Sequence, residues 1–172
     1  TAVQIREFCG CLITKKLYAK LTNRSSTLAK VTNLDQATGT GTFTFRYFIR
    51  YQSDTAASGV QFAVNHSGTL TSFVANARFQ ESTTAAVAGT ADQAHVTFGL
   101  VSGGAARAKS ATTAIVQTVV VDTQNADMLM IIEGTFVCTV TGNLELYAAK
   151  EAAAAGIMST MQDSVLILQK IA

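Results

Sequence analysis

The chain has 172 residues, of which 48% are hydrophobic and only 14% are charged, whereas charged residues make up about 25% of an average soluble domain. This length fits one domain, or one domain with an extended arm. The composition excludes an intrinsically disordered chain, and the scattered glycines exclude a collagen-like repeat. No apolar run approaches the roughly 20 residues with which a helix spans a bilayer.

The net charge of +2 is unevenly distributed along the chain. Residues 1–34 carry six basic residues and one acid, and the remainder carries seven basic and ten acidic residues. This charge, together with weak periodicity, predicts that residues 1–34 form a basic attachment arm on a domain of residues 35–172. Such an arm can dock on an acidic partner or touch nucleic acid, or it can be a solvated leader that keeps the chain soluble.

From residue 42 onwards, apolar and polar residues alternate with a period of two, which is typical of half-buried strands. In the first predicted strand, residues 42–51, the odd positions are all large and apolar, whereas most even positions are polar. A tight turn is predicted at residues 66–68. Similar strands are predicted at residues 60–65, 70–79 and 95–101.

The last third of the sequence is more apolar. Residues 113–121 and 127–141 are apolar on both parities, as expected for strands that are covered on both faces. Gly134 interrupts the second of these strands and predicts a bulge or a close approach of another backbone. Residues 141–143, Thr-Gly-Asn, are typical of a hairpin turn and predict pairing with a strand at residues 144–147.

The final predicted strand covers residues 164–171, and the alanine-rich residues 148–158 are predicted to be a loop or a single turn. Short strands separated by turns at regular intervals predict an all-β fold, a β-sandwich of the jelly-roll type with a basic N-terminal arm. The shared parity of the large apolar residues predicts the core, which includes Phe43, Phe45, Tyr47, Val60, Phe62, Phe73, Phe79, Val96, Phe98, Leu144 and Leu146.

No group of titratable residues forms a known catalytic or metal-binding motif. His66 and His95 belong to no ligand cluster, and Cys9, Cys11 and Cys138 lack the spacing of a zinc site. The cysteines are therefore interpreted as reduced thiols that pack like small apolar residues. Signatures of a serine nucleophile or a phosphate-binding loop are absent. The sequence predicts no catalytic residue, no cofactor and no metal.

Two weaker signals have simpler explanations. Asp122, Asn125 and Asp127 supply fewer oxygen ligands than calcium requires, and turn formation explains them. Glu133 and Glu145 could face each other across the predicted hairpin, as the carboxylates of a glycosidase do. The chain contains no Trp to form a sugar platform, so this pair is weak support for an enzyme.

Nucleic-acid binding would need basic residues interleaved with aromatic residues that stack on bases. Arg46, Tyr47, Arg50 and Tyr51 have this order, but the alternation places both Tyr side chains on the buried face. Core packing explains the pattern, and no nucleic-acid partner is expected.

Two stretches of the sequence resemble segments of structural proteins of tailed bacteriophages. In the first, residues 43–65, an aromatic strand ends in Tyr-Gln-Ser, a turn rich in Thr, Ala and Gly follows, and the next strand ends in Asn. The second is residues 125–134, which are followed by residues 142–146, Glu151 and the terminal residues 166–171. The resemblance spans roughly residues 34–172.

This resemblance implies a jelly-roll fold like that of tumour-necrosis-factor-type trimers and a place in the virion, and it implies no catalytic residues. We therefore expect a homotrimeric capsid decoration or cement protein that lies on the capsid surface and clamps the major capsid protein or another virion protein. The alternative is a tail-fibre or receptor-binding module that recognises the host surface, for example a surface glycan. No enzymatic activity and no membrane partner are expected.

Two sets of residues are expected to make these contacts. The strands that are apolar on both parities would supply the trimer interface, at Val120 and Met130. The arm would bind its partner through cations and apolar anchors, namely Arg6, Phe8, Leu12, Lys15, Lys16, Lys20 and Arg24.

Overall fold

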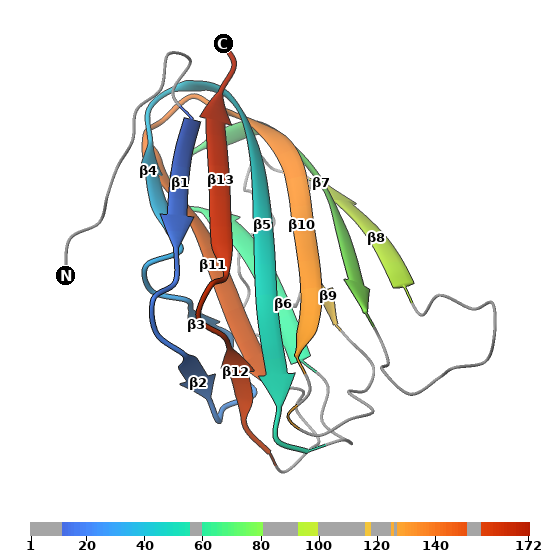
Figure 1. The fold of residues 1–172 in the computed structure, drawn as a ribbon. Coiled ribbons are helices and arrows are strands. Elements are labelled where there is room, and N and C mark those ends of the chain that lie inside the picture. Colours follow the sequence, from blue (N-terminus) through green and yellow to red (C-terminus); the bar gives the residue numbers. More distant parts are fainter. Residues whose placement is uncertain are drawn as a thin grey trace.

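The computed structural model describes residues 12–55, 60–80, 93–99, 116–117, 125, 127–150 and 156–172, with only the backbone at 79–80, 93–99 and 116–117. All regular elements within these ranges are β-strands, arranged in two sheets (Figure 1). The predicted all-β sandwich is therefore confirmed. The described ranges include no helix that is long and apolar enough to cross a membrane.

Sheet A is antiparallel and contains eight of the described strands. Their bounds are β1 Leu12–Lys16, β2 Leu21–Asn23, β5 Gly41–Ser53, β7 Leu70–Gln80, β8 Gln93–Gly99, β10 Met128–Cys138, β12 Met158–Thr160 and β13 Val165–Lys170. The strand order is β1-β13-β5-β10-β7-β8, and the short strand β12 pairs with both β5 and β2.

Sheet B is also antiparallel and contains five of the described strands. Their bounds are β3 Ala29–Lys30, β4 Gln36–Thr38, β6 Val60–His66, β9 Val116–Gln117 and β11 Gly142–Lys150. The order is β3-β11-β6-β9, and β4 pairs with β11 as well. Successive long strands thus alternate between the sheets, because β5, β7 and β10 belong to sheet A, whereas β6 and β11 belong to sheet B.

The core lies between the two sheets and is rich in aromatic rings. The rings of Phe43 and Phe136 stack with centroids 5.1 Å apart, and Tyr51 of sheet A meets Phe62 of sheet B edge-on at 5.6 Å. Side chains of Phe79, Val96 and Phe98 lie outside the described part. The other predicted core residues are buried, which confirms Phe43, Phe45, Tyr47, Val60, Phe62, Phe73, Leu144 and Leu146.

The predicted hairpin at residues 141–143 is wrong. Strand β10 pairs with β5 and β7, whereas β11 pairs with β3, β4 and β6, so the connection crosses from one sheet to the other. Gly142 lacks the positive φ that a primed hairpin turn requires. Glycine is needed there for another reason, because a Cβ atom would lie 2.2 Å from the backbone nitrogen of Gly68.

The loop predicted at residues 148–158 is wrong at both ends. Strand β11 continues through Ala148 and Ala149 to Lys150, and both alanines are buried. Strand β12 begins at Met158, and residues 151–155 lie outside the described ranges. Small alanine side chains fit a strand that is closely covered on both faces, although they produce no apolar alternation.

The close approach predicted at Gly134 is confirmed, and the alternative of a bulge is not. A Cβ atom at Gly134 would lie 2.3 Å from the carbonyl oxygen of Val74 on β7. The register of β10 against both neighbours runs unbroken through this glycine, and the shift lies between Val137 and Cys138.

The predicted arm is wrong for residues 12–34, because these residues belong to the domain. Strand β1 pairs with β13 in sheet A, and β3 pairs with β11 in sheet B. Four side chains between these strands and β4 are buried in the core, namely Leu17, Leu28, Val31 and Leu34. Strands of two to five residues are too short to produce a periodic pattern, and for this reason the segment resembles an arm. Residues 1–11 lie outside the described ranges.

Candidate interaction surface

The outward side chains of β13, β5, β10 and β7 form one continuous face, which we call the outer face of sheet A. The strand register places these side chains in rows that run across the sheet. One row is polar apart from its first member and contains Ile167, Arg46, Glu133 and Asn76. The next row is apolar apart from its last member and contains Val165, Phe48, Ile131 and Arg78.

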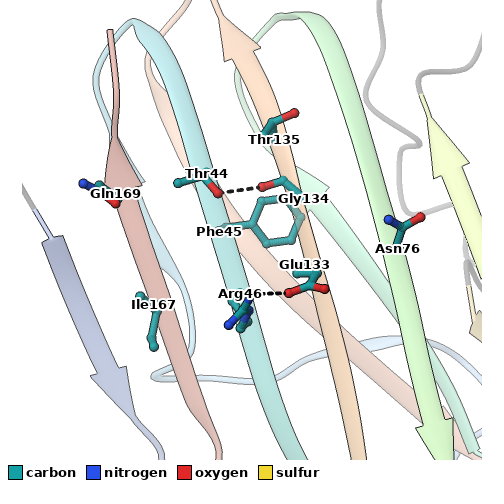
Figure 2. A pocket seen from close by; sticks show the side chains of 9 residues that line it. All are labelled: Thr44, Phe45, Arg46, Asn76, Glu133, Gly134, Thr135, Ile167 and Gln169. Atoms are coloured by element: carbon teal, nitrogen blue, oxygen red, sulfur yellow. Dashed lines mark hydrogen bonds and ion pairs between the residues drawn. The ribbon is translucent and has the colours of Figure 1, made fainter.

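The polar row borders a shallow groove of about 370 Å³ (Figure 2). Gln169 and Ile167 lie on one side of the groove, and Asn76 lies on the other. The hydroxyl of Thr44 donates a hydrogen bond to the carbonyl oxygen of Gly134 at 3.2 Å, so two strands are joined beneath the groove. The groove therefore presents hydroxyl and amide groups beside charged ones.

Glu133 forms ion pairs with two arginines on the outer face. Its carboxylate lies 2.5 Å from Arg46 Nη2, without the angle of a hydrogen bond, and it accepts a hydrogen bond from Arg78 Nη2 at 2.7 Å. The side chains of both arginines are about half exposed. Because water screens such pairs, they contribute little to stability, but they leave the face with a small net charge.

A second charged network lies beyond the apolar row. Arg50 Nη2 pairs with Asp127 Oδ2 at 2.6 Å, and Asp163 lies within 3.6 Å of Arg50 and 2.6 Å of Lys16. The hydrogen bond between Lys16 and Asp163 raises the pKa of Lys16 and lowers that of Asp163. The charges of this network are thus also paired inside the protomer.

Between the two networks, the outer face is apolar. Phe48 and Ile131 in the apolar row are half-buried, and Leu129, opposite Arg50 in the next row, is 43% exposed. Val74 on β7 lies on the other side of the polar row and is 52% exposed. The guanidinium group of Arg46 lies 5.7 Å from the centre of the Phe48 ring. An apolar centre with a polar, ion-paired rim is the usual composition of a protein–protein interface.

The sequence-predicted contact residues do not form one surface. Leu12 and Lys16 on β1 extend the outer face of sheet A, but Lys15 has the inward parity. Lys20 and Arg24 are exposed on either side of β2. Arg6, Phe8 and Val120 lie outside the described residues.

The prediction that Met130 lies at a trimer interface is wrong. Its side chain is 0% exposed and belongs to the protomer's own core, on the same parity of β10 as Ile132 and Phe136. The opposite parity, with Leu129 and Ile131, faces outward. Both parities are apolar in sequence, so the pattern alone did not distinguish them.

Glu133 and Glu145, the predicted carboxylate pair, lie in different sheets and bind different cations. Lys30 Nζ bridges Asp35 Oδ2 at 2.8 Å and Glu145 Oε1 at 3.0 Å, and the Tyr147 hydroxyl donates to Glu145 Oε2 at 2.8 Å. The hydrogen bond to Asp35 raises the pKa of Lys30 to about 12, so the amine stays charged and is no nucleophile. This cluster binds β3 to β11 and has a structural role.

The suggested calcium ligands are engaged in other contacts. Asp127 accepts hydrogen bonds from Arg50 and Gln52, and Asn125 adopts a positive φ of 57° in a turn. Asp122 lies outside the described residues. Within the ranges that the structure covers, no cluster of three or more His, Cys, Asp and Glu side chains is placed to hold a metal.

No protein-family model matches the sequence, and no curated protein sequence matches it. Among solved structures, an alignment with the structure of infectious bursal disease virus Gx strain has a TM-score of 0.24 and 10% sequence identity. It covers 94% of this chain and 36% of the viral chain. A TM-score this low does not establish a common fold, so the alignment carries no argument about function.

Proposed function

We propose that the protein is a structural component of a phage virion, a homotrimeric capsid decoration protein that binds the major capsid protein and stabilises the head lattice. The observation that carries this proposal is the outer face of sheet A. It combines exposed apolar side chains, such as Leu129 and Val74, with charges that are already paired inside the protomer. Such a face suits permanent packing against another subunit.

The occupant of this face is a second copy of the chain. Cations and anions are interspersed on the face and nearly balance, because Arg46, Arg50 and Arg78 stand beside Glu133, Asp127 and Asp163. Two such surfaces can approach each other without net repulsion, whereas a strongly acidic or basic partner would find no complementary charge.

The strand order supports the jelly-roll part of the proposal. Apart from the β7–β8 hairpin, sheet A has the order β1-β13-β5-β10 and sheet B the order β3-β11-β6-β9. Strand β1 pairs with β13, the last strand of the chain. Between these two strands, the chain alternates between the sheets in the manner of two Greek keys. Viral capsid proteins are among the proteins that use this arrangement, although a fold alone does not determine a function.

The proposal is tested by counting copies in purified particles. Virions of the phage that encodes this protein should be purified and analysed by quantitative mass spectrometry. The ratio of this protein to the major capsid protein should be fixed and should equal one trimer per threefold lattice position. Absence from the particle, or a copy number that matches the tail, contradicts a capsid role.

The groove in Figure 2 favours a second candidate, a tail-fibre or receptor-binding module that recognises a host glycan. Its hydroxyl, amide and guanidinium groups, from Thr44, Gln169, Asn76 and Arg46, are suited to hydrogen bonding with sugar hydroxyls. A tail-like copy number, together with loss of host adsorption in the Asn76→Ala variant, would favour this function over the first.

A further inference from the structure

Three connections between the sheets meet at one end of the sandwich. We call this region the crossing corner and define it as residues 38–40, 66–69 and 138–142. The backbone of Ser67 donates to the carbonyl oxygen of Asn143, and the backbone of Thr139 donates to that of Thr69, both at 3.0 Å. These bonds tie the connection after β6 to the connection after β10.

The packing of the crossing corner leaves no space for rearrangement. A Cβ atom at Gly68 would lie 2.3 Å from the carbonyl oxygen of Val140, and the imidazole Cε1 of His66 would be 3.0 Å from it. The same Cε1 atom would lie 2.8 Å from a Cβ atom at Gly142. His66 therefore fills the space between the two glycines, and any movement of its ring displaces both connections.

The hydrogen bonds of His66 determine its tautomer. The backbone N–H of Gly68 donates to Nδ1 at 3.1 Å, so Nδ1 carries no proton. The Nε2 atom lies 2.7 Å from the hydroxyl of Thr38, which itself donates to the carbonyl oxygen of Gly142 at 3.3 Å. The hydroxyl proton is thus committed to Gly142, and Nε2–H must be the donor to Thr38. Only the neutral imidazole satisfies all three bonds.

In the described part of the chain, no titratable side chain near His66 is free to accept a second imidazole proton. The side chain is 3% exposed, and the Phe136 ring of β10 packs against it at 5.3 Å. Among the described residues, the nearby titratable groups are the Cys138 thiol and the Glu145 carboxylate. Cys138 donates to the carbonyl oxygen of Gly39, and Glu145 has the outward parity of β11 and already binds Lys30 and Tyr147.

We propose that the crossing corner is an acid-sensitive latch, in which protonation of His66 releases the connections after β6 and β10 from each other. A proton on Nδ1 faces the N–H of Gly68, so two donors oppose each other and the hydrogen bond breaks. The buried imidazolium then moves towards water, because an uncompensated charge is costly in an apolar site. The direction of the pKa change agrees with this mechanism, since burial lowers the pKa of His66.

Amide hydrogen exchange followed by NMR tests the latch in the isolated protein. After correction for intrinsic exchange, protection of the Gly68 and Ser67 amides should fall at least about tenfold between about pH 7.5 and pH 5, the range in which histidine changes charge. Protection of Phe45 in the middle of β5 should not change. The His66→Gln variant should show no such fall, whereas His95→Gln, which removes the only other histidine, should behave like the wild type.

The imidazole ¹⁵N shifts provide a second readout that does not depend on the folding of a variant. At about pH 7.5 they should show His66 protonated at Nε2 and not at Nδ1. Protonation at Nδ1 at that pH, or Gly68 protection that does not change with pH in the wild type, overturns the proposal. An equal fall in a folded His66→Gln variant overturns it as well.

Discussion

On the outer face of sheet A, Leu129 and Val74 are 43% and 52% exposed, whereas Ala63 and Ala149, on the outward parity of sheet B, are 0% exposed. The ion pairs differ in the same way. Arg46 of sheet A keeps half of its side chain in water, but the side chain of Glu145 in sheet B is only 10% exposed. The comparison indicates that sheet B is covered within the protomer, and that sheet A is the face left for another subunit.

The largest expected effect concerns residues 12–34, which contribute strands to both sheets. Deleting residues 1–34 should abolish folding, because it removes β1, β2, β3 and the buried Leu17, Leu28, Val31 and Leu34. Deleting residues 1–11 removes no described strand and should leave a cooperatively folded domain. Circular dichroism with thermal unfolding measures the folding of both deletion variants. A folded fragment of residues 35–172 would contradict the conclusion that β1, β2 and β3 are part of the domain.

A matched pair of variants tests whether the two sheets differ in the strength of their ion pairs. Glu145→Gln should lower the free energy of unfolding by about 1.5 to 3 kcal/mol, because a buried charged hydrogen-bond partner is lost. Glu133→Gln should cost less than about 1 kcal/mol, as expected for an exposed pair. Urea unfolding measures the loss of unfolding free energy in each variant. Equal losses would show that the ion pairs of the two sheets do not differ in strength.

Alkaline pH should weaken the sheet B cluster. The pKa of Lys30 is raised from 10.5 to about 12 by its bonds to Asp35 and, more weakly, Glu145. Burial and the bond to Glu145 raise the pKa of Tyr147 from 10.0 to about 12. Both groups lose protons first in the unfolded chain, so their contribution to stability is complete below about pH 10 and is lost as pH rises towards 12.

This loss is measured as the urea midpoint across that pH range, in the wild type and in Glu145→Gln. The wild type should lose stability more steeply, because the variant lacks the carboxylate that raises both pKa values. Parallel curves would mean that Glu145 does not control the titration of the cluster.

The sequence predicted the strands of sheet A well where one parity meets the core and the other meets water. Strand β5 is the best example, because its alternation of Phe43, Phe45 and Tyr47 with Thr44 and Arg46 identified both faces correctly. Strand β10 is apolar on both parities, since its outward side contributes Leu129 and Ile131 to the outer face. For this reason the pattern alone assigns Met130 to the outer face, whereas its side chain is buried in the core.

Other features depend on contacts between residues that are distant in sequence. Gly142 has the local signature of a turn, yet it is a glycine because the backbone of Gly68 passes close to it. The burial of His66 follows from the meeting of three connections, which no local pattern reveals. The cluster of Lys30, Asp35 and Glu145 joins residues more than a hundred positions apart in sequence.

Light scattering of purified variants tests most directly whether the outer face of sheet A is the subunit interface. The wild type should have the mass of a trimer at micromolar concentration, and Leu129→Glu should be a folded monomer, because an added charge at the margin of the apolar row opposes association. Val140→Glu is the matched control, since Val140 is 51% exposed in the connection after β10, and it should remain a trimer. A monomeric wild type, or a trimeric Leu129→Glu variant, would contradict the account.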